Sequence, residues 1–156
     1  SGKYPVEAVA MMARVIHEAE ESRYDDLSLA AQLGKTKTAR EAIAAAGLVA
    51  AERAAAKAIV AASWSGETGR MLAKYRVELP LLVASPVPTV VRQLNLSWGV
   101  TPFLLTGARD TDALLRALLA GAKRSKLLRK NDPVVVISGS RVGSSGGANL
   151  VGLRTV

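Results

Sequence analysis

The amino-acid sequence predicts an α/β fold: a three-layer α/β/α domain around a mostly parallel, five-stranded sheet. Four short apolar runs without polar alternation are separated by segments of helical character, which is typical of parallel strands covered on both faces. A fifth apolar segment follows after a Gly- and Ser-rich loop of ten residues, too short for a helical crossover. We therefore expect an antiparallel edge strand at the C-terminal end. The five runs lie at residues 59–62, 79–84, 100–105, 133–137 and 149–156.

The composition narrows the classes of function. A chain of 156 residues with a net charge of +8 is long enough for one domain with an appendage. It contains no Cys and a single His, His17, which excludes disulfides, thiolate zinc sites and clusters of His ligands. No apolar run approaches the ~18 residues of a membrane span. We therefore expect neither a metal site nor contact with a membrane.

Ahead of the alternating pattern, Pro5–Glu21 has the apolar spacing of an amphipathic helix. No strand of its own precedes it, so we expect this helix to belong to a structure upstream. Residues 23–37 have no clear period and are interpreted as a linker. The sequence thus divides into residues 1–22, the linker and an α/β domain at 38–156.

Helices are expected between the apolar runs. Thr38 is a favourable N-cap, and Glu41 three residues later completes a capping box. The first helix of the domain is therefore expected from Ala39 to about Ala58. Further helices are expected at residues 70–75, 89–94 and 110–128.

The loop after the first apolar run, residues 63–69, has the composition of an anion site. Ser63, Ser65 and Thr68 supply hydroxyl groups, and Gly66 allows the backbone to approach a ligand closely. A helix that starts after such a loop offers unpartnered N–H groups to a phosphate. The alternative is that Ser65 only caps the following helix, with Glu67 stabilised in its first turn.

A second loop, residues 138–147, leaves the fourth apolar run as the 63–69 loop leaves the first. Ligands of open α/β sheets bind at the carboxyl ends of the strands, so we expect both loops to border one pocket. Arg141 would then reach a phosphate or sugar oxygen. Neither loop is a nucleotide fingerprint, because the first lacks the Gly-Lys-Ser/Thr ending of a P-loop and no helix follows the second.

Seven motifs, in the correct order, resemble the C-terminal domain of pyruvate kinase and the last helix of that enzyme's barrel domain. They are Gly2–Val9 with Met11 and Met12; Thr38 with Glu41–Ile43; Ala56–Val60; Ser65-Gly66 with Thr68, Lys74–Arg76 and Pro80; Leu94 with Trp98–Val100; Asp110–Asp112; and Lys130 through Leu150. The resemblance implies that residues 1–22 are the terminal helix of an absent β/α barrel and that residues 38–156 are the allosteric, regulatory domain.

The resemblance also implies a function for the whole enzyme. Pyruvate kinase transfers phosphate from phosphoenolpyruvate to ADP in its barrel, with Mg²⁺ and usually K⁺. This piece would then contain no catalytic residue, need no cofactor and be inactive alone. The enzyme is expected in the cytoplasm, with an organelle left open. The family forms tetramers in which C-terminal domains pair, and Asn149–Val156 is a natural self-pairing edge, unless Arg154 protects it.

In effector-regulated members of the family, the loop that matches 63–69 holds the phosphate of a sugar phosphate, and the loop that matches 138–147 closes over the sugar. The candidate effector site comprises Ser63, Trp64, Ser65, Gly66, Thr68, Arg141 and Gly143. Glu67 stands where a basic residue is common and would repel a dianion. Gly107 and Leu114 stand where animal and yeast forms grip a second phosphate. Fructose 1,6-bisphosphate is therefore not the expected ligand, which leaves a monophosphate, another phosphosugar or a vestigial site.

Two other functions remain open on the sequence alone. One is a stand-alone module that binds a phosphorylated metabolite and has no kinase activity. The other is a nucleic-acid-binding protein that uses the seven basic residues between Arg109 and Lys130. No aromatic stacking platform accompanies these residues, so we expect an anionic metabolite and no nucleic acid.

Overall fold

The computed structural model of the chain describes residues 2–22, 36, 38–108, 110–139 and 147–156. These residues belong to two compact units, with helix α1 (Pro5–Glu20) in the first and every other element in the second. α1 buries none of its residues, so apolar side chains such as Val6 and Val9 are exposed. The expected N-terminal helix is thus present. The linker expected at 23–37 lies outside the described residues, apart from residue 36.

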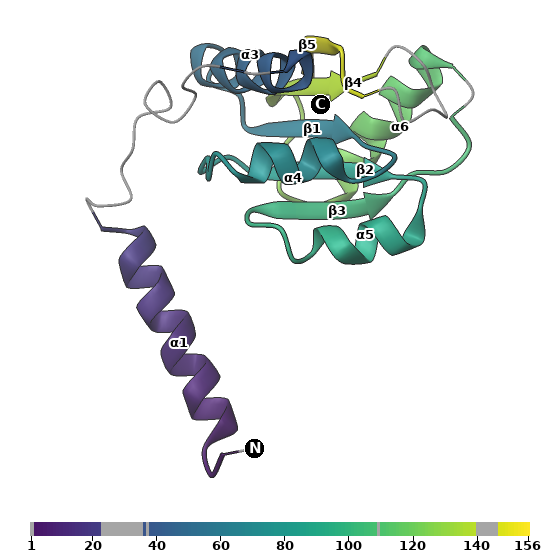
Figure 1. The fold of residues 1–156 in the computed structure, drawn as a ribbon. Coiled ribbons are helices and arrows are strands. Elements are labelled where there is room, and N and C mark those ends of the chain that lie inside the picture. The colour runs from purple at the N-terminus through teal and green to yellow at the C-terminus, as the bar shows by residue number, and fades with distance from the viewer. Residues whose placement is uncertain (1, 23–35, 37, 109, 140–146) are drawn as a thin grey trace. The chain divides into compact units, whose positions relative to one another are not determined.

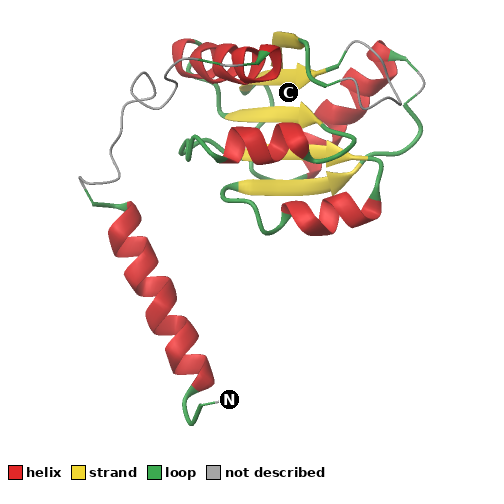
Figure 2. Ribbon diagram, in the orientation of Figure 1, coloured by secondary structure: helices red, strands yellow, loops and turns green. Residues whose placement is uncertain are grey.

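The second unit is a five-stranded sheet with helices on both faces (Figures 1 and 2). The first four strands pair in parallel and the last runs antiparallel to its neighbour. The predicted α/β fold with an antiparallel C-terminal edge is therefore confirmed. In the spatial order β3-β2-β1-β4-β5, the strands are β3 (Val100–Leu104), β2 (Leu81–Ser85), β1 (Ala58–Ala62), β4 (Pro133–Ser138) and β5 (Leu150–Thr155).

Helices cover both faces of the sheet (Figure 1). Glycines bring the helices close: a Cβ on Gly47 of the first helix would lie 2.4 Å from Ile137 Cδ1, and one on Gly69 of the second 3.0 Å from Val83 Cγ1. One face carries α3 (Ala39–Arg53), α4 (Glu67–Ala73) and α5 (Pro88–Leu94), and the opposite face carries α6 (Thr111–Arg124).

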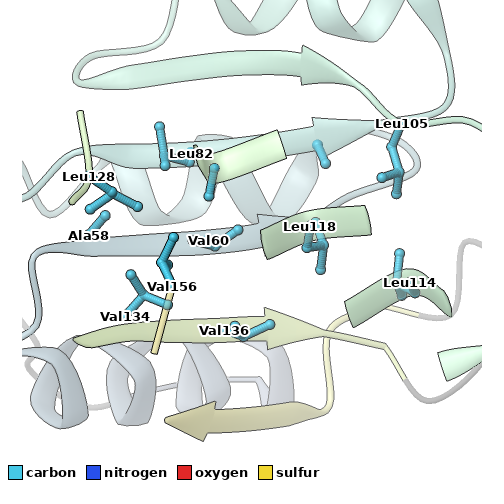
Figure 3. Packing of buried hydrophobic residues seen from close by; sticks show 12 residues of the cluster. Ala58, Val60, Leu82, Leu105, Leu114, Leu118, Leu128, Val134, Val136 and Val156 are labelled. Carbon is cyan, nitrogen blue, oxygen red and sulfur yellow. The ribbon is translucent and has the colours of Figure 1, made fainter. Parts of the chain in front are cut away.

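The core on the α6 face is formed by alternate residues of the central strands. Val60, Leu82 and Val134 are fully buried there beside Leu118 of α6 (Figure 3). Because successive strand residues point to opposite faces, their neighbours along each strand face the other three helices. This two-sided burial explains why the strands read as uninterrupted apolar runs.

Three helix boundaries differ from the sequence-based expectation by three residues or more. α3 ends at Arg53 rather than near Ala58, because the chain turns at Ala55 with φ 48°. α6 ends at Arg124, where Ser125 caps it before Lys126 adopts φ 61°. α4 begins at Glu67, three residues earlier than expected. Among the described helices, none is long and apolar enough to cross a membrane.

Candidate functional site

The carboxyl ends of β1 and β4 lie side by side, since the two strands pair in parallel with Ala61 opposite Ile137. The 63–69 loop and the loop that begins at Gly139 therefore leave the same edge of the sheet. This is the edge at which open α/β sheets bind ligands. Arg141 and Gly143, which were expected to contact a ligand, lie outside the described residues.

A cavity of about 340 Å³ opens at this edge. Four residues of the candidate effector site line it, namely Ser63, Trp64, Ser65 and Thr68. Both described ends of the second loop line it as well, at Gly139 and at Gly147-Ala148. The remaining lining residues are Arg40 and Ala44 of α3, Ala62, Glu67, Met71, Ala84, Pro86, Leu105, Gly107, Ala108 and Leu114.

The 63–69 loop folds onto its own hydroxyl groups. Ser63 Oγ accepts from the Thr68 N–H at 3.3 Å, and Ser65 Oγ accepts from the Glu67 N–H at 3.4 Å. Gly66, at φ 79°, is the N-cap of α4 and has no side chain of its own with which to cap the helix. The N-cap position is therefore Gly66 and not Ser65, because the turn requires a left-handed residue and only glycine adopts that conformation readily. Glu67 lies in the first turn, as expected. The Glu67 and Thr68 N–H groups at the start of α4 thus already have hydroxyl partners.

Two residues that the sequence analysis did not identify hold this loop in place. Ser85, fully buried at the end of β2, donates from Oγ to the Trp64 carbonyl at 3.3 Å and accepts from the Val87 N–H at 3.2 Å. Arg70 of α4 donates from Nη2 to the Ser65 carbonyl at 2.9 Å. The loop is thus fixed from the neighbouring strand and from the helix that follows it.

The charge at the cavity comes from an ion pair between two helices. Arg40 Nη1, in the first turn of α3, lies 2.5 Å from Glu67 Oε2, in the first turn of α4. Their side chains are 44% and 48% exposed, respectively. Glu67 is therefore neutralised by a neighbour, which its position in the sequence did not indicate. Arg40 also runs along Gly147, where a Cβ would lie 2.6 Å from Arg40 Nε.

Apolar side chains form most of the remaining wall. Met71, Pro86 and Leu105 come from three different segments of the chain and meet at the cavity. Leu114, only 6% exposed, also lines it, as does Gly107. Among the described residues, no group of three His, Cys, Asp or Glu side chains is placed to hold a metal ion.

Comparison with known proteins points to one family. Residues 41–153 match the family described as "Pyruvate kinase, alpha/beta domain". The whole chain is 33% identical to the pyruvate kinase of Clostridium acetobutylicum, of which it covers 33%. It is 34% identical over 99% of its length to pyruvate kinase 2 of Synechocystis, covering 26% of that protein. It is 36% identical over 96% of its length to the enzyme of Corynebacterium efficiens, covering 31%. The chain thus spans about a third or less of each of these relatives.

Proposed function

The chain belongs to the pyruvate kinase family, and from this premise we propose that it is the C-terminal regulatory and assembly domain of a pyruvate kinase. The full-length protein would transfer phosphate from phosphoenolpyruvate to ADP, giving pyruvate and ATP. The match over residues 41–153 supports the domain assignment. The share of the relatives that the chain covers supports a catalytic part outside this piece.

In this proposal the chemistry takes place upstream of the chain. Mg²⁺ and K⁺ would be bound in that upstream part. α1 would be the last helix of the catalytic barrel. Its exposed apolar side chains, which include Val6, Val9 and Met12, support that placement because such a surface is normally covered by a neighbouring element.

The proposed activity is tested by joining the natural upstream sequence to this chain and measuring pyruvate formation from phosphoenolpyruvate and ADP. We expect activity from the longer protein with Mg²⁺ and K⁺ and none from the 156-residue chain. A longer protein that folds but forms no pyruvate would contradict the proposal and favour a stand-alone binding module. Pyruvate formation by the short chain would contradict it as well.

The regulatory role is proposed for the cavity at the carboxyl edge. The observation that carries it is that Ser63, Ser65, Thr68, Arg40 and both described ends of the second loop line one cavity. Hydroxyl and guanidinium groups are suitable donors to phosphate oxygens. We infer that the ligand is a phosphorylated metabolite that acts as an effector of the enzyme.

Calorimetric titration of glucose 6-phosphate tests the effector site. A variant with Ser65→Ala and Thr68→Ala is expected to bind several-fold more weakly than the unchanged chain, because two donors to the phosphate are lost. Thr101→Ala, which removes an exposed hydroxyl on β3 away from the cavity, serves as the control. Equal affinity of the double variant and the unchanged chain would remove the 63–69 loop as the binding site.

Assembly is proposed through β5. In the described part of the chain no strand pairs with the outer side of β5, which is the last strand of the sheet. An edge of this kind has unmet backbone groups, and a second copy of the same edge satisfies them in a two-fold arrangement. The proposed full-length assembly is a tetramer that contains such pairs.

A further inference from the structure

We propose that Arg40 recognises the negative charge of the ligand. An anionic group bound at the 63–69 loop replaces Glu67 as the ion-pair partner of Arg40. The pocket then selects a phosphomonoester with one anionic group and a largely apolar remainder. This inference rests on the effector site proposed above. It adds a specificity-determining residue outside both loops and a chemical class of ligand.

The charges at the cavity support the exchange. Among the described residues that line it, Arg40 and Glu67 are the only charged side chains, and they are paired with each other. Solvent weakens this pair, since both side chains are nearly half exposed. A guanidinium binds a phosphate through two parallel hydrogen bonds, and this geometry makes the phosphate a strong competitor for Arg40.

The Arg40–Glu67 pair lies next to the proposed phosphate position, so Arg40 changes partners over a short distance. Glu67 lies in the chain between Ser65 and Thr68, which both line the cavity. A phosphate at these hydroxyls is therefore next to the carboxylate that holds Arg40. Gly147 leaves the space that the arginine side chain occupies, because any Cβ there would meet Arg40 Nε at 2.6 Å. The absence of a side chain at Gly147 thus leaves room for Arg40 to extend from α3 to the 63–69 loop.

The residues that line the cavity indicate the chemistry of the ligand beyond its phosphate group. Leu105 and Leu114 are almost fully buried where they line the cavity, and no described cation faces them from the lining. A second phosphate against these side chains would lose its hydration, and the described lining offers no cation there to replace it. Trp64, 45% exposed, lines the same cavity and offers an aromatic face. An apolar or planar remainder matches these surfaces.

The test is a double-mutant cycle on the 156-residue chain with phenyl phosphate as the probe, followed by calorimetry. Arg40→Gln is expected to weaken binding at least tenfold, and Glu67→Gln to tighten it at least threefold because Arg40 is then released. The double variant is expected to bind several-fold more weakly than the unchanged chain, since the cationic contact is lost. If Arg40 and Glu67 instead interacted only with each other and not with the ligand, the double variant would bind like the unchanged chain. The proposal would then be overturned.

Two controls separate charge from contact. Arg53→Gln removes one positive charge from the exposed end of α3 away from the cavity and is expected to leave the affinity unchanged. Arg40→Lys keeps the charge but loses the paired donors, so its affinity is expected between those of the unchanged chain and Arg40→Gln. A loss in Arg53→Gln equal to that in Arg40→Gln would overturn the role of Arg40, because net charge alone would then explain it.

Competition between probes tests the ligand class. Phenyl phosphate is expected to bind more tightly than inorganic phosphate, and fructose 1,6-bisphosphate no more tightly than fructose 6-phosphate. A tenfold preference for the bisphosphate would overturn the single-anion class. If the Ser65→Ala and Thr68→Ala change weakens binding and Arg40→Gln does not, the inference fails and the effector site stands. If none of these probes binds, both fail.

Discussion

Thr38 connects the stability of the α/β domain to the position of Arg40. Its Oγ1 accepts from the Glu41 N–H at 3.2 Å, and its own N–H donates to Glu41 Oε2 at 3.1 Å. Together these bonds form a complete capping box at the start of α3. Arg40 lies between the two residues, in the turn that the box holds. We predict that Thr38→Ala destabilises the domain and loosens this turn.

The expected loss of unfolding free energy in Thr38→Ala follows from the N-cap interaction that the substitution removes. Replacing a Thr N-cap by Ala costs about 1 kcal/mol of unfolding free energy, within a range of about 0.5–2 kcal/mol. The remainder of α3 stays packed, because Ala44, Leu48 and Ala51 are buried against the sheet. The loss is therefore confined to the cap. For a domain of this size it corresponds to a decrease in Tm of about 3–6 °C.

Urea denaturation followed by far-UV circular dichroism measures the change in free energy. Thr38→Ser is the matched control, since it keeps the hydroxyl group and is expected to retain most of the stability. The affinity for phenyl phosphate is expected to decrease less in Thr38→Ala than in Arg40→Gln, because the guanidinium is still present. Equal stability of Thr38→Ala and the unchanged chain would refute the reasoning. An equal loss in Thr38→Ser would also refute it.

Three further changes test the packing and the assembly. Gly121→Ala is expected to cost about 1–3 kcal/mol despite the better helix propensity of Ala, because the new Cβ would lie 2.2 Å from Phe103 Cε2; in thermal denaturation Phe103→Leu should restore part of this loss. Leu118→Ala, at a fully buried position, is expected to cost about 2–5 kcal/mol in urea titrations, whereas the exposed Arg116→Ala should stay within about 0.5 kcal/mol. Leu153→Asp on β5 is expected to abolish self-association in sedimentation velocity without loss of folding; an unchanged dimer would place the interface elsewhere.

The three central strands β1, β2 and β4 were predictable because they are buried on both faces and so consist almost entirely of apolar residues. The antiparallel direction of β5 was predictable from the length of the loop before it. The end of α3 was not, because the alanine-rich sequence continues past Arg53 with the same composition, and the turn at Ala55 is set by the start of β1. The spatial order of the strands likewise depends on packing that no single segment encodes.

Only part of the candidate site could likewise be predicted from the sequence. The 63–69 loop was identified because its hydroxyl groups and glycines are local in sequence. Arg40 and Ser85 were not, because they reach the loop from 27 and 21 residues away in sequence, respectively. An arginine in the first turn of a helix and a serine at the end of a strand have no local pattern that indicates a role at a distant loop. Their contribution arises only when the sheet brings the segments together.

The effect of Glu67 on anion binding depends on its contact with Arg40. Taken alone, a carboxylate beside a bound phosphate is unfavourable: two like unit charges 4 Å apart repel by about 4 kcal/mol at an effective dielectric constant of 20. With Arg40 in place the pair is neutral, and a ligand that accepts Arg40 gains a partner. It does so at the expense of leaving Glu67 to solvent, where half of that side chain already lies. Because a weak or diffuse anion recovers too little from the guanidinium to offset the broken pair, the acidic residue raises the threshold for binding. In the proposed site, Arg40 without Glu67 would bind small anions more readily, so the carboxylate would favour selectivity over affinity.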